Sequence, residues 1–595
     1  MLKLSGWIQA RLRRPGGEWT VFFVLGCFAA YFVYYLSAFY AFLGTTLTDF
    51  SWGDVSWVHQ AFYNFVSDRP LQTSLYYFSG DGVAGNLYPY ANQLAMHLNL
   101  TPYLLSLPYK ISPGLLTLYS TVIAFNVLGY PLFLFLILRH YGPRRFWYSY
   151  AALLAVLFSP WFIGLITYKC LFPLYQGVII LALHYAFLKE NRPAFTAVAL
   201  LLLLVSEDAA LFMLGYAGCL AFFSGRKFFP LAAAALAAFY TGLSAFVLHP
   251  IFKLDMLTSH KVPADVVVRL GKVFSGEASI NPTDVGYYAG LTGAVLAISM
   301  LLAGKPRGGA LKMALALVLV APSAHWFITF VNGGGHHPMP VFTMLLIAAA
   351  VLLSSGEEEQ GAFVPVRRLL ALPLFFYVFW LGLYALPSMA IDTGTDFSQS
   401  RTGIKPRVRI FSAYRYTVEN SSGVIASNRD TIAAVRAIPK DHSVVYWTNR
   451  TVEGFFVDRS DIWRFPSYYD RADFVVVQKN ALAALFDLAP AVRPADLKWP
   501  DNSMLNISET PAASFPALLS RGIQTSSWQK APVSAEAVAL LRKELSFPGG
   551  RYIIHSENEN VLVFKRKVRY EFPMPKSSLG FGWLSSAPRF FRRQF

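Results

Sequence analysis

Long apolar segments recur along almost the whole amino-terminal two thirds of the sequence. A helix needs roughly 20 apolar residues to cross the hydrocarbon core of a membrane. The chain has 595 residues, of which 55% are hydrophobic and 16% aromatic, which is too apolar for a water-soluble protein of this length. The sequence therefore predicts a polytopic α-helical membrane protein with about eleven spans. The expected spans are 20–44, 114–138, 147–166, 173–188, 194–206, 209–224, 228–248, 287–303, 312–330, 341–354 and 369–388.

The formal net charge of +17 is explained by membrane topology. Clusters of Lys and Arg fall between alternate spans, and all of them lie on one side of the membrane if the spans are assigned as above. The basic stretch before the first span predicts a retained span with a cytoplasmic amino terminus rather than a cleaved leader. Residues after 388 are then expected outside, and no nucleic-acid partner is predicted.

The segment LLLLVSEDAALFMLGY, Leu201–Tyr216, places two adjacent acids inside a long apolar run. One long helix would reverse the side of every later basic cluster, so two short helices that meet at an external tip fit better. Each short helix is below the length of a full span, which predicts a recess that is open to water or lined by protein. Glu207 and Asp208 would lie at its base.

Hydropathy falls after residue 388 and charges of both signs mix. We therefore predict a membrane domain over residues 1–388, with a long first external loop at 45–113, and an extracytoplasmic α/β or α+β domain over 389–595. Within that domain, residues 428–447 read as a helix, a proline turn and a strand, and further strands are expected at ADFVVVQK, RYIIHSE and NVLVFKR.

The first external loop contains an amphipathic segment, Asp54–Phe65. Val55, Val58, Phe62 and Phe65 share one helical face and Ser56, Gln60 and Asn64 the other, which predicts a helix lying in the membrane interface. Asp54 begins this helix, so its carboxylate either acts as a general base or is favoured by the helix dipole; the two roles are compatible. Asp49 is the neighbouring candidate.

Other ionisable or polar groups fall on the same external side. Adjacent histidines cannot easily ligate one metal ion together, so no metal site is predicted at the GGGHHPMP loop. Three cysteines offer no metal or disulfide pattern, no resident cofactor is identified, and participation of a divalent cation such as Mg²⁺ or Mn²⁺ stays open. Lys169 is a cation that could meet a lipid phosphate or serve as a headgroup anchor. The expected substrate-binding residues are Glu207, Asp208, His59, Gln60, Asn64, His97, His336, His337 and Lys169, and the expected catalytic residues are Asp54 and Asp49.

Several stretches together carry a resemblance to a known family. DVSWVHQAFYN, the pair Pro108–Tyr109, LVSEDAAL, the His336–Pro340 loop, AIPKDHSVVYWTN and YDRADFVVVQK are similar to the prokaryotic membrane-protein family called domain of unknown function 2079. The resemblance covers most of residues 45–480. In that family the residue before the glutamine is often acidic, whereas here it is His59.

That family is in turn similar in layout to the glycosyltransferase C superfold. The resemblance implies an inverting enzyme of the cytoplasmic (inner) membrane of a prokaryote that uses a polyprenyl-phosphate-linked sugar. It implies Asp54, or failing it Asp49, as the base that deprotonates the acceptor hydroxyl, and it implies donor or acceptor contacts for Glu207 and Asp208. The chain has no phosphate-binding glycine loop and no nucleophile elbow, which counts against ATP-driven transport and hydrolysis.

Two readings from other classes stay open. A transporter or flippase for a lipid-linked or polar solute would use acidic and histidine groups as proton relays. It predicts polar residues that continue to the cytoplasmic side, and few are seen. A non-catalytic membrane assembly protein would bind a partner through its external domain, and would tolerate joint loss of Asp54, Glu207 and Asp208.

Overall fold

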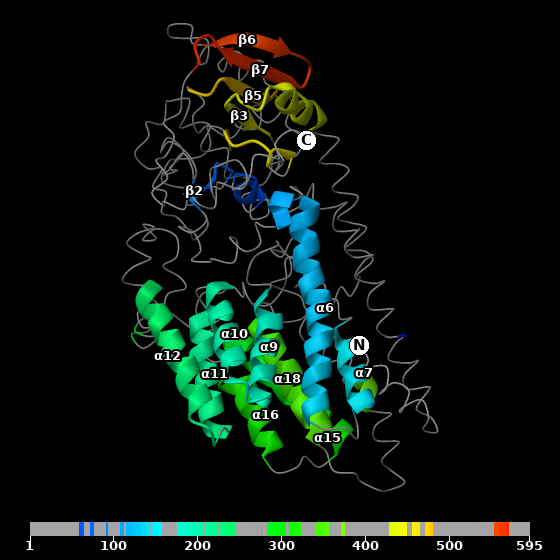
Figure 1. Cartoon of the computed structure of the whole chain (residues 1–595). Coiled ribbons are helices and arrows are strands. Elements are labelled where there is room, and N and C mark those ends of the chain that lie inside the picture. Colours follow the sequence, from blue (N-terminus) through cyan, green and yellow to red (C-terminus); the bar gives the residue numbers. More distant parts are fainter. Residues whose placement is uncertain are drawn as a thin grey trace. The chain divides into compact units, whose positions relative to one another are not determined.

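In the computed structural model the chain forms two compact units (Figure 1). Unit 1 consists of Met1–Leu43, His97–Leu104 and Leu118–Tyr414, and unit 2 of Gly44–Met96, Leu105–Thr117 and Arg415–Phe595. The structure describes residues 26, 59–64, 72–75, 91–92, 108–111, 115–141, 146–157, 175–205, 209–223, 225–244, 271, 275, 282–304, 309–322, 339–355, 371–374, 428–448, 455–464, 471–479 and 552–569.

Helices occupy nine of the predicted spans, those between 114 and 354. Their bounds are α6 Leu115–Tyr141, α7 Phe146–Val156, α9 Gln176–Leu188, α10 Arg192–Val205, α11 Ala209–Phe223, α12 Phe228–Leu243, α15 Pro282–Ala303, α16 Ala310–Leu319 and α18 Met339–Ser355. The first predicted span, 20–44, and most of the last, 369–388, lie outside the described residues. Among the described helices, one stretch, Ala124–Tyr141, is long and apolar enough to cross a membrane, and shorter apolar helices accompany it.

Helix α18 is the core of unit 1. Every residue from Met339 to Leu353 is buried, and α7, α9, α15 and α16 all pack against it. The peripheral helices bury one stripe only, which on α12 is Phe229, Ala233, Ala237 and Tyr240. Their outer faces carry large apolar side chains instead, such as Phe222, Leu231 and Phe239, each more than 60% exposed. Such an outer surface suits a bundle surrounded by lipid and would be costly in water.

The predicted pair of short helices is confirmed: α10 ends at Val205 and α11 begins at Ala209. The two helices contact each other and both contact α12 (Figure 1). The alternative of one long helix through this run is therefore wrong. Glu207 and Asp208 lie between the two helices in sequence, outside the described residues.

A histidine joins three helices inside unit 1. His184 on α9 is fully buried; its Nε2 lies 2.8 Å from the hydroxyl of Tyr141 on α6, and its Nδ1 lies 3.0 Å from the hydroxyl of Tyr216 on α11. Tyr141 also donates to the sulfur of Met313. If His184 carries its proton on Nε2, Tyr216 donates to Nδ1 and each of these hydrogens has an acceptor. Polar links of this kind hold helices together in an apolar surrounding.

Unit 2 contains a mixed five-stranded sheet in the order β4-β3-β5-β7-β6. Its strands are β3 Val444–Trp447, β4 Ile462–Arg464, β5 Phe474–Gln478, β6 Tyr552–Glu557 and β7 Val561–Arg566. Strands β4, β3 and β5 run parallel, with Val444 opposite both Ile462 and Phe474, while β7 pairs antiparallel with β5 and β6. The helix over residues 428–437 and the strands β3, β5, β6 and β7 are where the sequence predicted them; β4 was not predicted. A two-stranded pair, β1 Gln72–Thr73 and β2 Ala91–Asn92, completes the described strands.

Unit 2 differs from the domain predicted over residues 389–595 because it includes parts of the first loop. The β4 edge of the sheet contacts residues 72–75.

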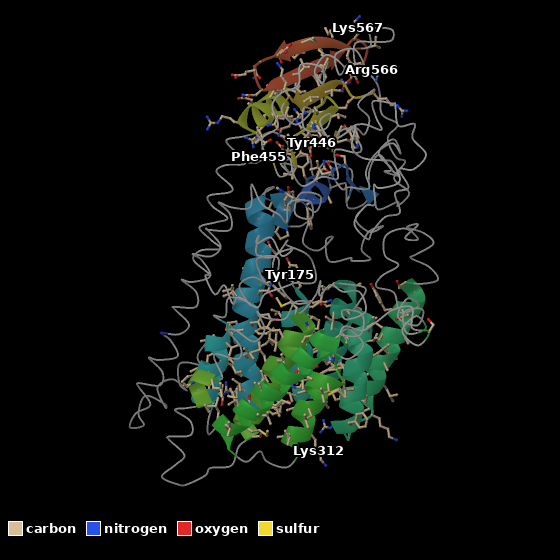
Figure 2. All side chains as sticks on the ribbon, turned by 180° about the vertical axis from the view of Figure 1, so that it is seen from behind. Tyr175, Lys312, Tyr446, Phe455, Arg566 and Lys567 are labelled. Atoms are coloured by element: carbon tan, nitrogen blue, oxygen red, sulfur yellow. The ribbon has the colours of Figure 1, made fainter. Side chains whose placement is uncertain are left out.

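Figure 2 places Arg566 and Lys567 at the end of β7, and it places Lys312 at the end of the bundle where α16 begins. Lys312 belongs, with Lys305 and Arg307, to a basic cluster after the predicted span 287–303, on the side predicted to be cytoplasmic.

We expect Gly215→Ala to destabilise unit 1 and Gly218→Ala, less than one turn away on α11, to be tolerated. A Cβ at Gly215 would lie 2.7 Å from the carbonyl oxygen of Val320 and closer still to that of Ala321, and backbone cannot move aside as a side chain does. A Cβ at Gly218 would meet only Val320 Cγ1 at an ordinary 3.5 Å. Overpacking of this kind costs about 1 to 3 kcal/mol. Thermal unfolding of both variants in detergent measures the difference, and equal melting temperatures would contradict it.

Candidate functional site

Three of the predicted site residues lie in the described part of the chain: His59, Gln60 and Asn64. All three belong to a short helix over residues 59–64 in unit 2. The other predicted site residues lie outside the described residues, and their roles stay predictions: Asp49, Asp54, His97, Lys169, Glu207, Asp208, His336 and His337. In sequence, the two histidines closely precede α18.

The helix over residues 59–64 does not have the water-facing side that an interfacial helix needs. Gln60 and Asn64, on its predicted polar face, are both fully buried, and so is Phe62 on its apolar face. The prediction of a helix lying on the membrane surface is therefore wrong for these residues. The helix is amphipathic, but its polar face meets other polar groups of unit 2 rather than water.

Gln60 has every hydrogen-bonding position of its amide occupied by protein. Its Oε1 accepts from the backbone N–H of Ser74 (2.8 Å) and of Leu75 (3.0 Å). Its Nε2 donates to Ser74 Oγ (2.9 Å) and to the carbonyl oxygen of Arg459 (2.6 Å). An amide has two donor hydrogens and two acceptor lone pairs, so this set is complete. The structure thus gives Gln60 a structural role, and its contact with substrate stays a prediction.

Ser74 connects the first loop to the edge strand of the sheet. Its hydroxyl donates to the carbonyl oxygen of Ser460 (3.0 Å) and accepts from the N–H of Ile462 at the start of β4 (3.3 Å). An edge strand leaves backbone groups unpaired, and native proteins cover or blunt such edges. Ser74 satisfies one of these groups, so the first loop covers part of the β4 edge.

The guanidinium group of Arg459 caps the helix over residues 428–437. It is buried and donates to the carbonyl oxygens of Pro439 (3.1 Å) and Val435 (3.0 Å), and also to that of Ile438. The last carbonyl groups of a helix lack partners within the helix and carry partial negative charge, so a cation there is favourable. Burial lowers the pKa of Arg459, but a guanidinium stays charged. Through its backbone and its side chain, Arg459 joins the first loop to this helix.

His59 is buried against Tyr109, with the two rings edge to face at 5.6 Å between centroids. Phe62 packs on the same tyrosine at 5.7 Å. Burial lowers the pKa of His59 to about 4, and the nearby Asp458 opposes this only in part. His59 is therefore neutral at physiological pH, which does not favour contact with a phosphate through charge.

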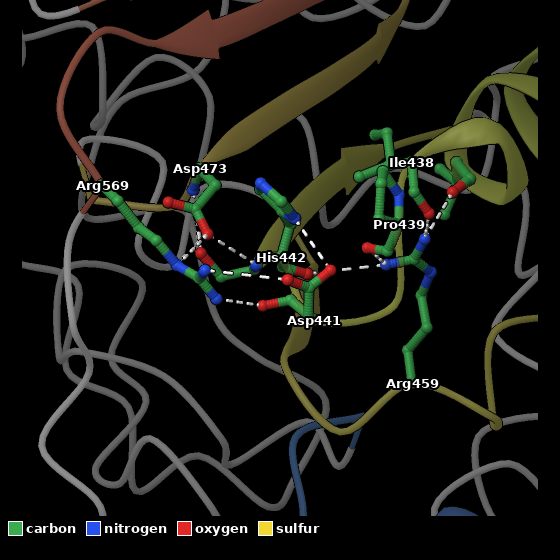
Figure 3. A network of polar contacts seen from close by, with 9 residues as sticks. Ile438, Pro439, Asp441, His442, Arg459, Asp473 and Arg569 are labelled. Atoms are coloured by element: carbon green, nitrogen blue, oxygen red, sulfur yellow. Dashed lines mark hydrogen bonds and ion pairs between the residues drawn. The ribbon is translucent and has the colours of Figure 1, made fainter.

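A second polar cluster lies at the amino ends of β3 and β5 (Figure 3). The N–H of Ser443 donates to Asp473 Oδ2 (3.0 Å), and the N–H of Asp473 donates to Ser443 Oγ (2.8 Å). Arg569 lies near the carboxylates of Asp473 and Asp441, and the ring hydrogen bond from His442 holds the pKa of Asp441 below its usual value. Ligand sites of parallel sheets lie at the carboxyl ends of the strands. This cluster lies at the amino ends of β3 and β5 instead, so we interpret it as structural.

Among the described residues, no group of three or more His, Cys, Asp or Glu side chains is placed to hold a metal ion. The acids predicted for the site lie outside those residues.

Comparison with protein-family models and with curated proteins gives no match. The resemblance to the domain of unknown function 2079 family therefore stays a prediction. Among solved structures, the chain is similar to ArnT from Cupriavidus metallidurans bound to undecaprenyl phosphate, at 12% identity and a TM-score of 0.42, over 80% of this chain and 96% of that one. It is also similar to the Archaeoglobus fulgidus oligosaccharyltransferase in the apo form, at 12% identity and a TM-score of 0.28, over 75% of this chain and 70% of that one. Both TM-scores are below 0.5, so neither likeness establishes the fold or the activity.

We expect unit 2 to lose stability as the pH falls from about 6.5 to about 4, the pKa of His59 in the unfolded and folded states. The unfolded chain takes up a proton in this window and the folded one does not, so the contribution of His59 is present above pH 6.5 and is lost as the pH falls. The shift corresponds to about 3 kcal/mol. Urea unfolding of unit 2 across this window measures it. His59→Phe keeps an aromatic ring against Tyr109 and should flatten the profile; an unchanged profile in this variant would contradict the assignment to His59.

We also expect Arg459→Met to destabilise unit 2 by about 3 kcal/mol or more, because several buried carbonyl groups lose a charged donor. Arg436→Met is the matched control. Arg436 lies on the helix that Arg459 caps, but it is exposed, with its guanidinium over the ring of Phe455. Unfolding monitored by tryptophan fluorescence compares the two. Similar losses in both variants would show that Arg459 has no special role as a cap.

Proposed function

We propose that this chain is a membrane glycosyltransferase that moves a sugar from a polyprenyl-phosphate donor to an acceptor at the external membrane surface. The proposal is supported by the predicted topology, which gathers the ionisable candidates on the external side. It is also supported by the resemblance of the first loop and of the LVSEDAAL segment to the family named above. The acceptor would be a lipid, a glycan or a protein.

The observation that carries the proposal is the burial of the helix over residues 59–64, in which every residue except Tyr63 is buried. Asp54 precedes His59 by five residues, so the chain is tied down a short distance after the proposed base. Five residues span at most about 18 Å when fully extended. A general base must reach its hydroxyl within hydrogen-bond distance, and a base carried near a fixed segment can meet this demand.

In the proposed reaction, the carboxylate of Asp54 takes the proton of the acceptor hydroxyl as its oxygen attacks the anomeric carbon of the sugar. The new carbon–oxygen bond forms while the bond from the anomeric carbon to the phosphate oxygen breaks, and polyprenyl phosphate leaves. Attack opposite to the leaving group inverts the anomeric centre. Asp49 is the alternative base, Lys169 would face the phosphate, and Glu207, Asp208, His97, His336 and His337 would bind donor or acceptor.

A transporter or flippase is the second candidate, and one observation favours it. The Tyr141–His184–Tyr216 link is a buried chain of exchangeable protons on helices predicted to cross the membrane. It lies on the helices α6, α9 and α11, near the basic clusters predicted to be cytoplasmic. A transporter would depend on His184 and would not release a sugar from its lipid carrier.

The test of the proposal compares Asp54→Asn with Asp81→Asn, an acid of the same loop for which no role is proposed. Each variant is expressed in a deletion strain, and surface glycans and lipid-linked sugars are profiled by mass spectrometry at matched protein levels. Loss of a general base lowers the rate by about 10² to 10⁴-fold, so Asp54→Asn should abolish the glycan and accumulate the lipid-linked donor. Asp81→Asn should restore the glycan and return the lipid-linked donor to the level seen with the unchanged protein.

Unchanged glycans in the Asp54→Asn strain would contradict the proposal. Loss of the glycan with donor trapped on the cytoplasmic side would favour the flippase instead. Normal function after joint replacement of Asp54, Glu207 and Asp208 would favour the assembly protein.

A further inference from the structure

Gln60 and Asn64 are spaced four residues apart and therefore lie on one face of the helix over residues 59–64. Gln60 Nε2 donates to the carbonyl oxygen of Arg459 (2.6 Å), and the hydroxyl of Ser460 donates to Asn64 Oδ1 (2.7 Å). Two successive residues before β4 thus hold two points along the same helix. Two anchors on one face fix both the position of a helix and its rotation about its axis.

The orientation of the Gln60 amide is unique. The N–H groups of Ser74 and Leu75 only donate and the Arg459 carbonyl only accepts, so Oε1 must face the first pair and Nε2 the second. Rotation of the amide by 180° would place donor against donor and acceptor against acceptor, and would leave buried groups unpaired. An unpaired buried donor or acceptor costs about 1 to 3 kcal/mol, which makes alternative placements of the helix unfavourable.

We propose that Gln60, supported by Asn64, is a positioning residue: it fixes the first-loop helix on the Arg459–Ser460 segment and thereby limits how far Asp54, six residues before Gln60 in the sequence, can lie from this anchor. The role in catalysis rests on the proposed function of Asp54; the anchoring does not. A displacement of about 1 Å in a catalytic group can lower the rate about 10²-fold, so loss of the anchor should act on turnover.

The first variant is Gln60→Ala in the full-length protein in lipid nanodiscs. The second is Ser460→Ala, which removes only the bond to Asn64 and leaves the four bonds of Gln60 in place, so it serves if Gln60→Ala does not fold. The matched control is Gln478→Ala, an equally buried glutamine of the same unit on β5, in the middle of the sheet.

Two readouts are taken on each variant. Amide hydrogen exchange is followed in peptides that cover residues 59–64 and 72–75 and in peptides that cover β5 and β7. Initial rates of sugar transfer are measured against the concentration of polyprenyl-phosphate-linked glucose, mannose and arabinose as the donor panel.

For Gln60→Ala we expect about tenfold faster exchange in the two first-loop peptides with unchanged exchange in β5 and β7. We expect kcat to fall at least about tenfold with KM little changed, because the base is misplaced while binding is kept. Ser460→Ala should also speed exchange in the first-loop peptides and lower kcat, but by smaller factors than Gln60→Ala. Gln478→Ala should not loosen the first-loop peptides selectively.

Unchanged first-loop exchange in both variants would overturn the anchoring. Faster exchange with unchanged kcat would overturn the positioning role while leaving the anchor standing. If the native protein transfers no sugar from any donor while Asp54→Asn leaves glycans intact, the proposed function fails and the positioning role with it, whereas the exchange data still decide the anchor.

Discussion

The side chain of Gln60 makes four hydrogen bonds in a buried site, and two distant parts of the chain meet at it. Burial of a primary amide is unfavourable unless its donors and acceptors are paired, so the site exists only when both parts are in place. The same residues shield the β4 edge through Ser74 and reach the helix over residues 428–437 through Arg459. Unit 2 is therefore built from the first loop and the carboxy-terminal strands together.

Unit 1 follows a different physical rule. Its central helix α18 is buried on all sides, while the peripheral helices present leucine and phenylalanine outward. Close helix contacts depend on small residues, as at Gly215, where the backbone of the neighbouring chain segment takes the place of a side chain. In lipid, such close packing and a few buried polar links hold helices together, because apolar burial between them gains little.

The helices and most strands could be predicted because their signals are local. Apolar run length located nine helices, loop charge separated α10 from α11, and β-branched runs located β3, β5 and β7. The β4 strand is only three residues long, too short for a periodic signal. The role of Gln60 could not be predicted, because its partner Arg459 lies 399 residues away and the local sequence gives no indication of this contact. Amphipathicity alone shows that a helix has a polar face, and does not show whether that face meets water, lipid headgroups or another part of the protein.

The separation between Gln60 and Arg459 also has a consequence for biosynthesis. Chains are synthesised at about 5 to 20 residues per second, so the first loop is made roughly 20 to 80 seconds before its partner exists. During that interval Gln60 can bond only to Ser74 and Leu75 within the first loop, while its bond to Arg459 and the bonds of Ser74 to Ser460 and Ile462 cannot form. The first loop therefore keeps part of its hydrogen bonding incomplete for most of synthesis, and the Arg459–Ser460 segment completes the site late.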